Sequence, residues 1–407
     1  MIDHYLGKSC VLGAGGRMGR GIALLLLEQL CRLPGEPRLL LIDTDQKALA
    51  RLEVYFKKKK IDWTRAEKIL TYSSDITDGK DFNLIFEAIV EDVEVKSHAF
   101  RTLAADSQGN SYYFTTTSSI PIRELSERAK LDGRLIGTQF YTPPTVQKLL
   151  EVIPPEGVNP ELIQIAQELA KRLGKTVVFS KDVAGFIGNG HFIREFLYAA
   201  KEVLRSTQSL PVAIAALNHV TQNFLVRPMG IFQLVDFIGI ELCAQLGHIM
   251  NTYQPEGEFL DPLIDRMIAE GKIGGLREDG TQKEGFFSYD DNIPSAVYSV
   301  EEKSYVPLPD LTALGVPPKG HFSWKALHKN PNASDILAPY VEHLLEDHSQ
   351  GSLLAQNFMV QSSKIAQGLV DQGVAQNLQD VDTVLRLGFH HLITPLNLSH
   401  HYTPQTG

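Results

Sequence analysis

The chain has 407 residues, which is too many for one hydrophobic core of ordinary size and predicts two or three domains. Its 43% hydrophobic and 21% charged residues are typical of globular proteins and argue against long disorder. A formal net charge of -9 argues against binding to nucleic acid or to an anionic membrane surface, because both attract basic proteins.

The cysteines and the first residues bear on the compartment. The cysteines are Cys10, Cys31 and Cys243. Because they are few, odd in number and scattered, they indicate a reducing compartment. None of them has metal-ligand spacing, so we predict no structural zinc. The N-terminus lacks the basic start and apolar core of a signal peptide. The apolar run 22–27 is too short to span a bilayer. We therefore expect a soluble, cytoplasmic protein without a membrane span.

The first elements alternate between strands and helices. Residues 8–12 form a strand candidate that ends at a glycine cluster, and helical periodicity follows through Leu30. A second apolar run, 39–42, stops at Asp43, and a third covers 84–86. Strands that alternate with helical stretches predict β-α-β units and a parallel sheet.

A basic and predicted helical arm lies between Leu52 and Thr77, with lysines at 57–60. The ordinary interpretation of this run is a solvated helix face, and the functional one is a contact to a phosphorylated ligand. From about Asn159 long helical patterns dominate, and strand signals fade after 177–179.

The proline-rich residues 294–331 resemble a linker, and helical periodicity resumes after them. We therefore predict an α/β fold, with a Rossmann-type doubly wound parallel sheet followed by all-α domains. The predicted divisions are a doubly wound domain at 1–183, a first helical domain at 184–293, a linker at 294–332 and a second helical domain at 333–407.

A glycine-rich loop follows the first strand and opens the first helix. Gly13, Gly16 and Gly19 are spaced as G-x-x-G-x-x-G, and Gly13 and Gly15 open a G-x-G. Glycines let the backbone approach a pyrophosphate, which the following helix N-terminus attracts. Asp43 ends the next strand. Its separation from the glycine loop is close to the spacing of about 20 residues expected for a ribose-binding carboxylate, and such a carboxylate favours NAD over NADP. The alternative is a tight turn with an unrelated acid.

With these features, the chain resembles 3-hydroxyacyl-CoA dehydrogenases through residues 8–290 and more faintly to its C-terminus. The matching segments occur in the family's order at 87–91, 117–119, 151–153, 181–186 with Asn189, and 228–230. The resemblance implies NAD as the cofactor, an acyl-CoA thioester as the substrate and a place in fatty acid β-oxidation.

The resemblance also implies roles for single residues. Glu91 and Lys96 would lie near the nicotinamide, Ser118 would hydrogen-bond the substrate's C3 oxygen, Glu151 would orient the catalytic base, and Asn189 would help hold substrate and cofactor. The lysines at 57–60 would lie on the arm that contacts coenzyme A. The cofactor-binding positions of the loop and the second strand would be Gly13, Gly15, Gly16, Met18, Gly19 and Asp43. Each residue also has an ordinary structural interpretation, such as a local turn hydrogen bond for Ser118.

The chain departs from the family at position 139. The family carries G-x-H-F-F-N-P, where residues 137–143 here read G-T-Q-F-Y-T-P, so Gln139 replaces the catalytic histidine and Thr142 the asparagine. A histidine titrates near neutrality and a glutamine does not. Losing a general base lowers the rate typically by roughly 10²–10⁴-fold. Glu151 through a water, or His191, is an alternative base. We expect Ser118, Gln139, Glu151 and Asn189 to converge between the two domains.

The C-terminal half resembles the family's helical domain twice. The segment 228–236 is similar to the family's P-M-G-P-F-x-L-x-D, and 285–289 to its G-x-G-F-Y ending. A weaker second copy covers 377–388 and 394–396. Such a tandem resembles multifunctional fatty-oxidation alpha subunits without their hydratase domain, and its two units would pack within one chain in place of a dimer partner. The resemblance to the family also implies self-association or β-oxidation partner enzymes. The alternative is a helical extension of 330–407.

Three functions remain open from the sequence. The first is an NAD-dependent 3-hydroxyacyl-CoA dehydrogenase with altered chemistry. The second is a non-catalytic homologue that binds NAD or acyl-CoA and has an assembly or regulatory role. The third is a reductase for another hydroxy acid with a different proton donor. Gln139 is the residue that separates the first two.

Overall fold

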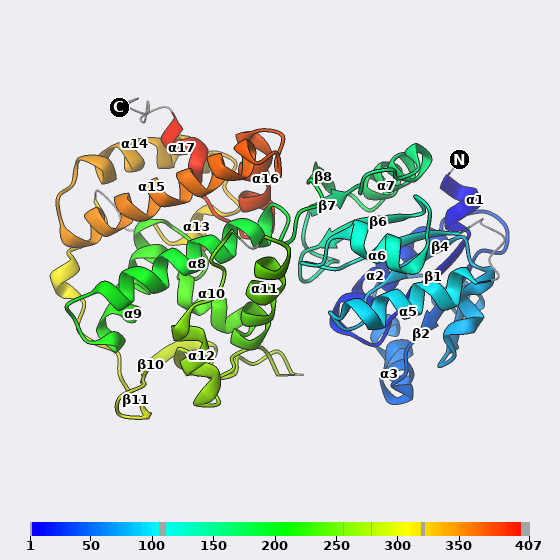
Figure 1. The fold of residues 1–407 in the computed structure, drawn as a ribbon, viewed down its shortest axis with the longest axis horizontal. Helices are drawn as coiled ribbons and strands as arrows, with labels where there is room; N and C mark the ends of the chain where they lie inside the picture. The colour runs from blue at the N-terminus through cyan, green and yellow to red at the C-terminus, as the bar shows by residue number, and fades with distance from the viewer. Residues whose placement is uncertain (1, 106–110, 255, 278, 319–321, 400–407) are drawn as a thin grey trace. The chain divides into compact units, whose positions relative to one another are not determined.

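The structure is a computed structural model that describes residues 2–105, 111–254, 256–277, 279–318 and 322–399. The chain divides into two compact units: unit 1 is Met1–Phe186 and unit 2 is Ile187–Gly407. Unit 1 holds an eight-stranded, mostly parallel sheet with flanking helices, and unit 2 is mainly helical (Figure 1). The predicted fold class is therefore confirmed.

The sheet of unit 1 has the strand order β3-β2-β1-β4-β5-β6-β7-β8. Among the pairs that the described residues form in it, the pair β6–β7 is antiparallel and the others are parallel. The strand order reverses between β1 and β4, which is where doubly wound sheets bind ligands beyond the carboxyl ends of their strands. The strands are β1 (Lys8–Leu12), β2 (Arg38–Ile42), β3 (Leu70–Ser73), β4 (Leu84–Glu87), β5 (Tyr112–Thr115), β6 (Leu135–Phe140), β7 (Leu149–Ile153) and β8 (Thr176–Phe179).

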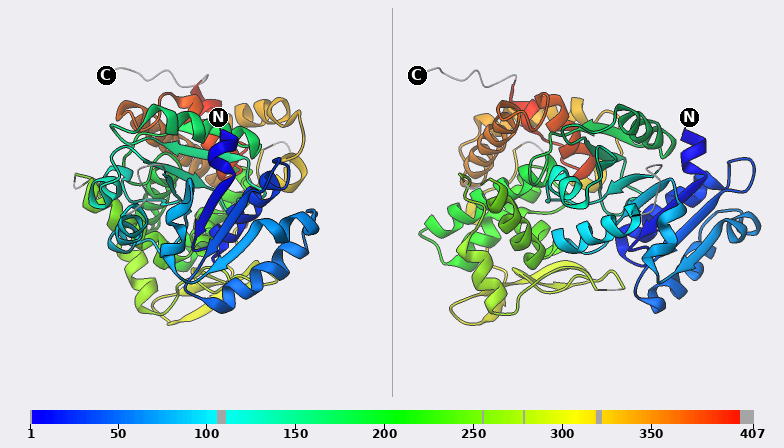
Figure 2. Two further views of the ribbon diagram at one scale, coloured as in Figure 1. Left: turned by 90° about the vertical axis from the view of Figure 1, so that its right-hand side faces the viewer. Right: turned by 45° about the vertical axis from the view of Figure 1, so that its right-hand side comes forward.

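Side chains of successive strand residues point to opposite faces of the sheet, and both faces are covered. On one face, Val11, Phe86 and Phe140 belong to a core shared with α1, α2, α3, α4 and α7. On the other face, Tyr113 packs edge-on against Phe100 of α5. The helices of unit 1 are α1 (Ile2–Leu6), α2 (Arg17–Leu30), α3 (Gln46–Lys57), α4 (Trp63–Ile69), η1 (Ile76–Asp81), α5 (Val93–Ala104), α6 (Ile122–Ala129) and α7 (Pro160–Arg172). Figure 2 shows the sheet and its helices from two further directions.

One prediction for unit 1 is wrong in part. The arm at 52–77 was expected to be helical, but Leu70–Ser73 forms β3 at the edge of the sheet beside β2. This strand is short and its sequence alternates weakly, so the pairing with β2 decides its conformation.

Unit 2 contains two long helices, α8 and α15, which contact each other where His191 Nε2 lies 3.2 Å from the Ser362 carbonyl oxygen. The helices of unit 2 are α8 (Gly188–Arg205), α9 (Leu210–His219), η2 (Val220–Phe224), α10 (Ile231–Ile238), α11 (Ile240–Tyr253), α12 (Pro262–Ala269), η3 (Thr312–Leu314), α13 (Trp324–Leu327), α14 (Ala333–Glu346), α15 (Gln350–Asp371), α16 (Leu378–Gly388) and α17 (Pro395–Ser399). The division into two helical copies stays a prediction.

Unit 2 also contains a three-stranded antiparallel sheet, which the sequence analysis missed. Its strands are β9 (Phe287–Asp290), β10 (Ile293–Ser299) and β11 (Ser304–Pro307), and the last two, apart from Ile293, lie within the predicted linker. Asp291 and Asn292, with φ of 49° and 64°, form the two-residue connection between β9 and β10. Positive φ at both positions is the geometry of a tight hairpin turn, for which Asp and Asn are favoured. The prolines of this stretch therefore predict a linker where the chain forms a hairpin.

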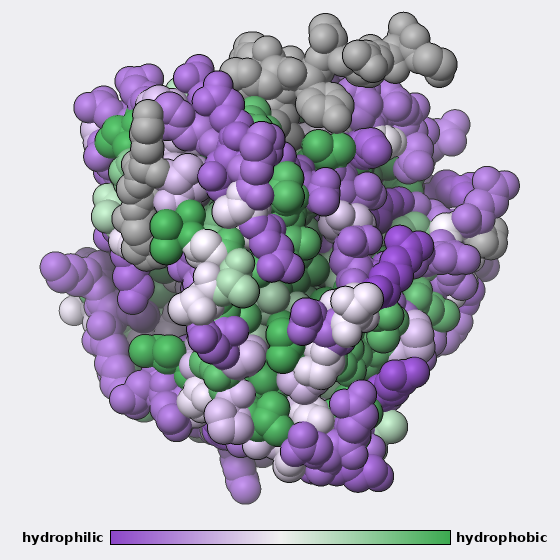
Figure 3. Space-filling model, turned by 90° about the vertical axis from the view of Figure 1, so that its left-hand side faces the viewer, coloured by the Kyte–Doolittle hydropathy of each residue, from purple (hydrophilic) through white to green (hydrophobic). Residues whose placement is uncertain are grey.

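Within the described ranges, no helix is long and apolar enough to cross a membrane. The surface seen in Figure 3 mixes hydrophobic and hydrophilic residues. Large apolar side chains that are exposed in unit 2 include Leu204, Leu242, Leu260, Leu308, Val316 and Leu353. Self-association and enzyme partners stay predictions.

Candidate functional site at the carboxyl edge of the sheet

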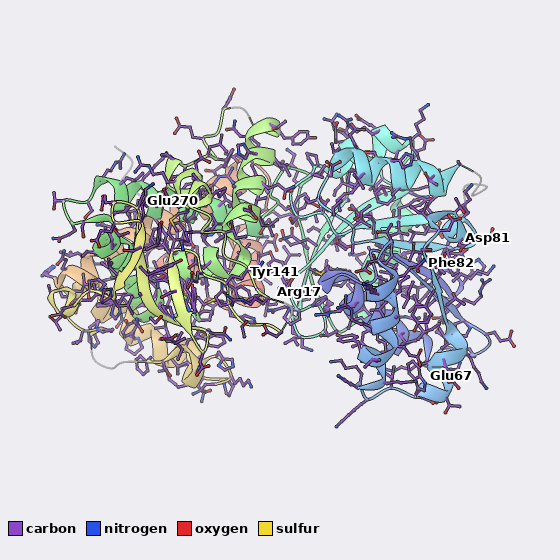
Figure 4. All side chains as sticks on the ribbon, turned by 90° about the horizontal axis from the view of Figure 1, so that it is seen from below. Arg17, Glu67, Asp81, Phe82, Tyr141 and Glu270 are labelled. Atoms are coloured by element: carbon purple, nitrogen blue, oxygen red, sulfur yellow. The ribbon has the colours of Figure 1, made fainter. Side chains whose placement is uncertain are left out.

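The predicted site residues of unit 1 gather where the parallel strands end. Leu12, Glu87, Thr115 and Gly137 lie side by side on β1, β4, β5 and β6. The loops after these residues therefore leave the sheet at one edge. Figure 4 shows Arg17 and Tyr141, which follow β1 and β6, at one end of unit 1, and Asp81 and Phe82, which precede β4, at the other.

The glycine loop is packed so closely that side chains would not fit. A Cβ at Gly19 would lie 2.1 Å from the Gly13 carbonyl oxygen, and one at Gly13 would lie 2.5 Å from that of Ala88. Gly13 also has a φ of 73°, which favours glycine. Gly16 is the N-cap residue of α2, whose first turn contains Arg17 and Met18 and no acidic residue. The loop therefore offers a helix N-terminus open to an anion, as a dinucleotide pyrophosphate requires.

Asp43 lies directly against this loop. Its Oδ2 accepts a hydrogen bond of 2.8 Å from the Gly15 backbone N–H, and its Oδ1 accepts one of 3.0 Å from the Asp45 N–H. The carboxylate is therefore held beside the glycines, where it can accept hydrogen bonds from a ribose and repel a 2′-phosphate.

We expect unit 1 to bind NADH more tightly than NADPH. Asp43→Ala should raise the Kd for NADH by roughly 10–100-fold, because a hydrogen bond to a charged group contributes about 1.5–3 kcal/mol. The same change should weaken NADPH binding far less. Fluorescence titration of both cofactors measures this, and equal or tighter binding of NADPH to the unmodified protein would contradict the role of Asp43.

Lys96 and two glutamates form a buried charge network beyond β4. Lys96 Nζ lies 2.6 Å from Glu87 Oε1 and 3.3 Å from Glu91 Oε2, and its side chain is 1% exposed. Glu87 Oε2 also accepts a hydrogen bond of 2.6 Å from the Thr115 hydroxyl. The network joins the ends of β4 and β5 to the start of α5. It therefore holds the loop that carries Glu91 in one place.

Glu91 binds the loop after β5 in turn. Its Oε1 accepts hydrogen bonds from the Thr117 hydroxyl at 2.6 Å, the Ser119 hydroxyl at 2.8 Å and the Ser118 N–H at 3.0 Å. Burial raises the pKa of Glu91, but the Lys96 ammonium and these donors outweigh burial and hold the pKa below its ordinary value. Glu91 is therefore an anion that fixes the backbone around Ser118.

Gln139 and Glu151 form a direct cross-strand pair between β6 and β7. Both side chains are buried, at 5% and 0% exposure. They lie on the face that α6 covers, because a Cβ at Gly137, on the same face of β6, would meet the Ile122 side chain at 2.7 Å. In the part of the chain that the structure describes, Gln139 Oε1 has no hydrogen-bond partner. Gln139 therefore occupies the place beside Glu151 that the sequence predicts for a catalytic base.

Tyr141 is a residue that the sequence analysis did not single out. It lies two positions after Gln139, directly after the end of β6. Its hydroxyl donates a hydrogen bond of 2.6 Å to Glu151 Oε1. Burial, and next the Glu151 carboxylate, raise the pKa of Tyr141 well above its ordinary value. The sequence does contain a signal for this residue, because Tyr141 has a hydroxyl at a position where the family motif has phenylalanine.

Asn189 and His191 lie in unit 2, near the start of α8. His191 is fully buried, with Nδ1 4.0 Å from Glu195 Oε1 and Nε2 near Ser362. Burial lowers the pKa of His191. These contacts place His191 in the interior of unit 2, which removes the support for it as an alternative base. Convergence of Asn189 with the residues of unit 1 stays a prediction.

The lysine run lies at the end of α3 and just after it. Lys57 is 2.5 Å from Glu53 and lies over the Trp63 ring, and Lys59 lies over the Tyr55 ring. Two of the four lysines are thus packed on aromatic rings, as side chains on a solvated surface often are. A contact to coenzyme A stays a prediction.

Comparisons with known proteins cover both units. The family model described as 3-hydroxyacyl-CoA dehydrogenase, NAD binding domain, matches residues 8–183, and the one for the C-terminal domain of the same family matches residues 185–284. The first match confirms NAD as the cofactor.

Named relatives agree with these matches. A Deinococcus radiodurans protein named "Probable 3-hydroxybutyryl-CoA dehydrogenase" is 30% identical over 54% of this chain and 76% of its own length. A fatty acid oxidation complex subunit alpha of Shewanella amazonensis is 28% identical over 69% of this chain and 39% of its own length.

A solved structure supports the fold along nearly the whole chain. The 3-hydroxybutyryl-CoA dehydrogenase of Escherichia coli K12 has a TM-score of 0.69 at 21% identity, covering 98% of this chain and 95% of that one. Together with the two matching family models, the carboxyl-edge geometry leads to one conclusion: the chain belongs to the 3-hydroxyacyl-CoA dehydrogenase family of NAD-dependent oxidoreductases.

Proposed function

We propose that the protein interconverts 3-hydroxyacyl-CoA and 3-oxoacyl-CoA with NAD as the hydride carrier, and that it does so with Gln139 at the position of the family's histidine. The observation that carries this proposal is the gathering of the glycine loop, Ser118 and the Gln139–Glu151 pair at one edge of the sheet.

The residues at this edge fit the cofactor. The loop around Gly13 and Gly19 has no room for a Cβ, and Asp43 is fixed beside it by the Gly15 N–H. When bound, NAD exchanges a hydride with the substrate's C3 carbon. The loop and the N-terminus of α2 would hold the pyrophosphate, and Asp43 would hold the adenosine ribose.

The residues around Ser118 fit a carbonyl or hydroxyl substrate. The Ser118 backbone is held by Glu91, which Lys96 fixes in turn, so the serine hydroxyl sits on a constrained loop. Gln139 supplies an amide that donates or accepts hydrogen bonds but does not titrate. Positioning of the C3 oxygen by Ser118 and Gln139 therefore survives the loss of the histidine, whereas proton transfer needs another group.

The test is NADH oxidation with acetoacetyl-CoA. We expect steady turnover by the unmodified protein, and none by Gly19→Val, because its side chain would overlap the Gly13 carbonyl and displace the cofactor loop. A protein that binds NADH and acetoacetyl-CoA in equilibrium titrations yet shows no turnover would instead be the non-catalytic homologue.

A further inference from the structure

We propose that the Tyr141 hydroxyl, hydrogen-bonded to Glu151, exchanges the proton with the substrate's C3 oxygen in place of the missing histidine. This inference rests on the proposed function, since it assigns a residue to the same reaction. It replaces a histidine–carboxylate pair with a tyrosine–carboxylate pair that uses the same glutamate.

The first support is the position of Tyr141. Gln139 and its cross-strand partner Glu151 point to the same face of the sheet. Tyr141 is the first residue after β6, and its hydrogen bond to Glu151 places its hydroxyl on that face. Phe140, between them, points into the core on the opposite face. The tyrosine hydroxyl therefore reaches the glutamate diagonally, next to the position where the family has its base.

The second support is the contact itself. The Tyr141 hydroxyl lies 2.6 Å from Glu151 Oε1, a short distance that is typical of a charge-assisted O–H···O⁻ hydrogen bond. Glu151 is completely buried, so its carboxylate needs such a donor. The family motif has phenylalanine at this position, which offers no donor. Compared with the family motif, this chain therefore has an additional hydroxyl at Tyr141, two residues after the position where Gln139 replaces the titratable imidazole.

The third support is the location at the cofactor's end of the sheet. The segment that follows Tyr141 packs on α2, because a Cβ at Gly21 would meet the Pro144 side chain at 2.6 Å. Helix α2 is the helix that the glycine loop opens. Tyr141 therefore lies in the loop that flanks the cofactor helix, at the same end of unit 1 as Arg17 (Figure 4).

A tyrosine hydroxyl can both donate and accept a proton, which is what the step requires. In oxidation, the C3 hydroxyl proton would move to Tyr141 Oη as the Tyr141 proton moves to Glu151, so that one proton ends on the carboxylate. Bound NAD⁺ would take the hydride from the C3–H bond, and with it the two electrons that the substrate loses. Reduction runs the same path backwards. Tyr141 stays neutral overall, so its high pKa does not stop the transfer.

The main experiment is Tyr141→Phe, which restores the family's residue and removes only the hydroxyl. We expect kcat for acetoacetyl-CoA reduction to fall by roughly 10²–10⁴-fold, the usual contribution of a general acid or base. The Kd for NADH should not change. The matched control is Tyr112→Phe, which removes another tyrosine–glutamate hydrogen bond, 2.7 Å long, from the amino end of the same sheet to Glu161. This control should leave kcat unchanged.

A second variant separates proton transfer from packing. In Gln139→His/Tyr141→Phe both residues match the family motif, and Glu151 is again beside an imidazole. We expect this double variant to recover most of the activity that Tyr141→Phe loses. Its kcat should also acquire a pH dependence near the pKa of histidine, about 6.5. A solvent deuterium isotope effect on the unmodified enzyme should disappear in Tyr141→Phe if proton transfer passes through the hydroxyl.

The possible failures are distinguishable. If the unmodified protein shows no turnover with acetoacetyl-CoA, the proposed function itself fails. If it turns over and Tyr141→Phe keeps full activity while binding NADH normally, the proposed function stands and the role of Tyr141 is wrong. The role is also wrong if Tyr141→Phe loses activity and Gln139→His/Tyr141→Phe does not regain it.

Discussion

Replacing Lys96 with methionine should lower the free energy of unfolding by about 3–5 kcal/mol, the range measured when one partner of a buried ion pair is removed. Lys96 contacts both Glu87 and Glu91 and is almost completely buried. Methionine fills a volume similar to that of lysine. The decrease in the free energy of unfolding therefore measures the cost of leaving the two carboxylates without their cation. Urea denaturation followed by circular dichroism measures it.

The effect of Lys96→Met should depend on pH. The folded-state pKa of Glu91 lies below its ordinary value, so its contribution to stability is complete above about pH 5 and is lost as the pH falls through the folded-state pKa. The difference between the two proteins should therefore be largest at neutral pH and shrink on acidification. The control is Lys57→Met, which breaks a half-exposed pair with Glu53 and should cost less than about 1 kcal/mol. Equal losses for both variants would show that burial does not govern the Lys96 network.

The second large effect is expected in unit 2 for Arg227→Met. Arg227 donates two hydrogen bonds of 2.9 Å to the two carboxylate oxygens of Glu195, and both side chains are less than 5% exposed. Burial raises the pKa of Glu195, but Arg227 outweighs burial and holds the pKa well below its ordinary value. Removing the guanidinium should cost about 3–5 kcal/mol, because it leaves a buried carboxylate unpaired.

A double variant shows whether the cost comes from the charge. Arg227→Met/Glu195→Leu removes both charges and should recover most of the stability that Arg227→Met loses, since well-packed apolar residues often replace a buried ion pair without cost. Arg205→Met, which breaks an exposed pair with Glu202, should cost less than about 1 kcal/mol. If the double variant were no more stable than Arg227→Met, the loss would come from the packing of Arg227, for which its contact with the Phe358 ring is the candidate.

The sequence predicted those parts of unit 1 whose cause is local. Gly13 and Gly19 have no room for side chains, so the loop can be recognised from spacing alone. The apolar strand that ends at Asp43 fixes the position of its carboxylate beside that loop. Because these constraints act within a few residues or across one strand pair, the geometry of the glycine loop and Asp43 follows from the chain's own pattern.

The predictions failed where local patterns were weak. The sequence predicts a helical arm where the short edge strand β3 lies, and its prolines predict a linker over most of β10. The turn at Asp291 and Asn292 carried a usable signal, but strand pairing rather than periodicity determined both elements.

By itself, the sequence determined the Rossmann-type fold and the use of NAD, and it predicted the residues of the cofactor site and Gln139 at the position of the family's histidine. Only the tertiary structure decided that a tyrosine joins that glutamine beside Glu151. The antiparallel register of β6 and β7 pairs Gln139 with Glu151, as the resemblance implied, and it also brings Glu151 within reach of the Tyr141 hydroxyl. Tyr141 and Glu151 are ten positions apart, and spacing alone does not pair them. Lys96 is another example, because its partners on β4 and in the following loop lie around it only once the strand and α5 have packed. The physical reason is the same in both cases. A buried charge or hydroxyl is satisfied by whichever partner the packed fold places within hydrogen-bond distance, and that choice is made in three dimensions.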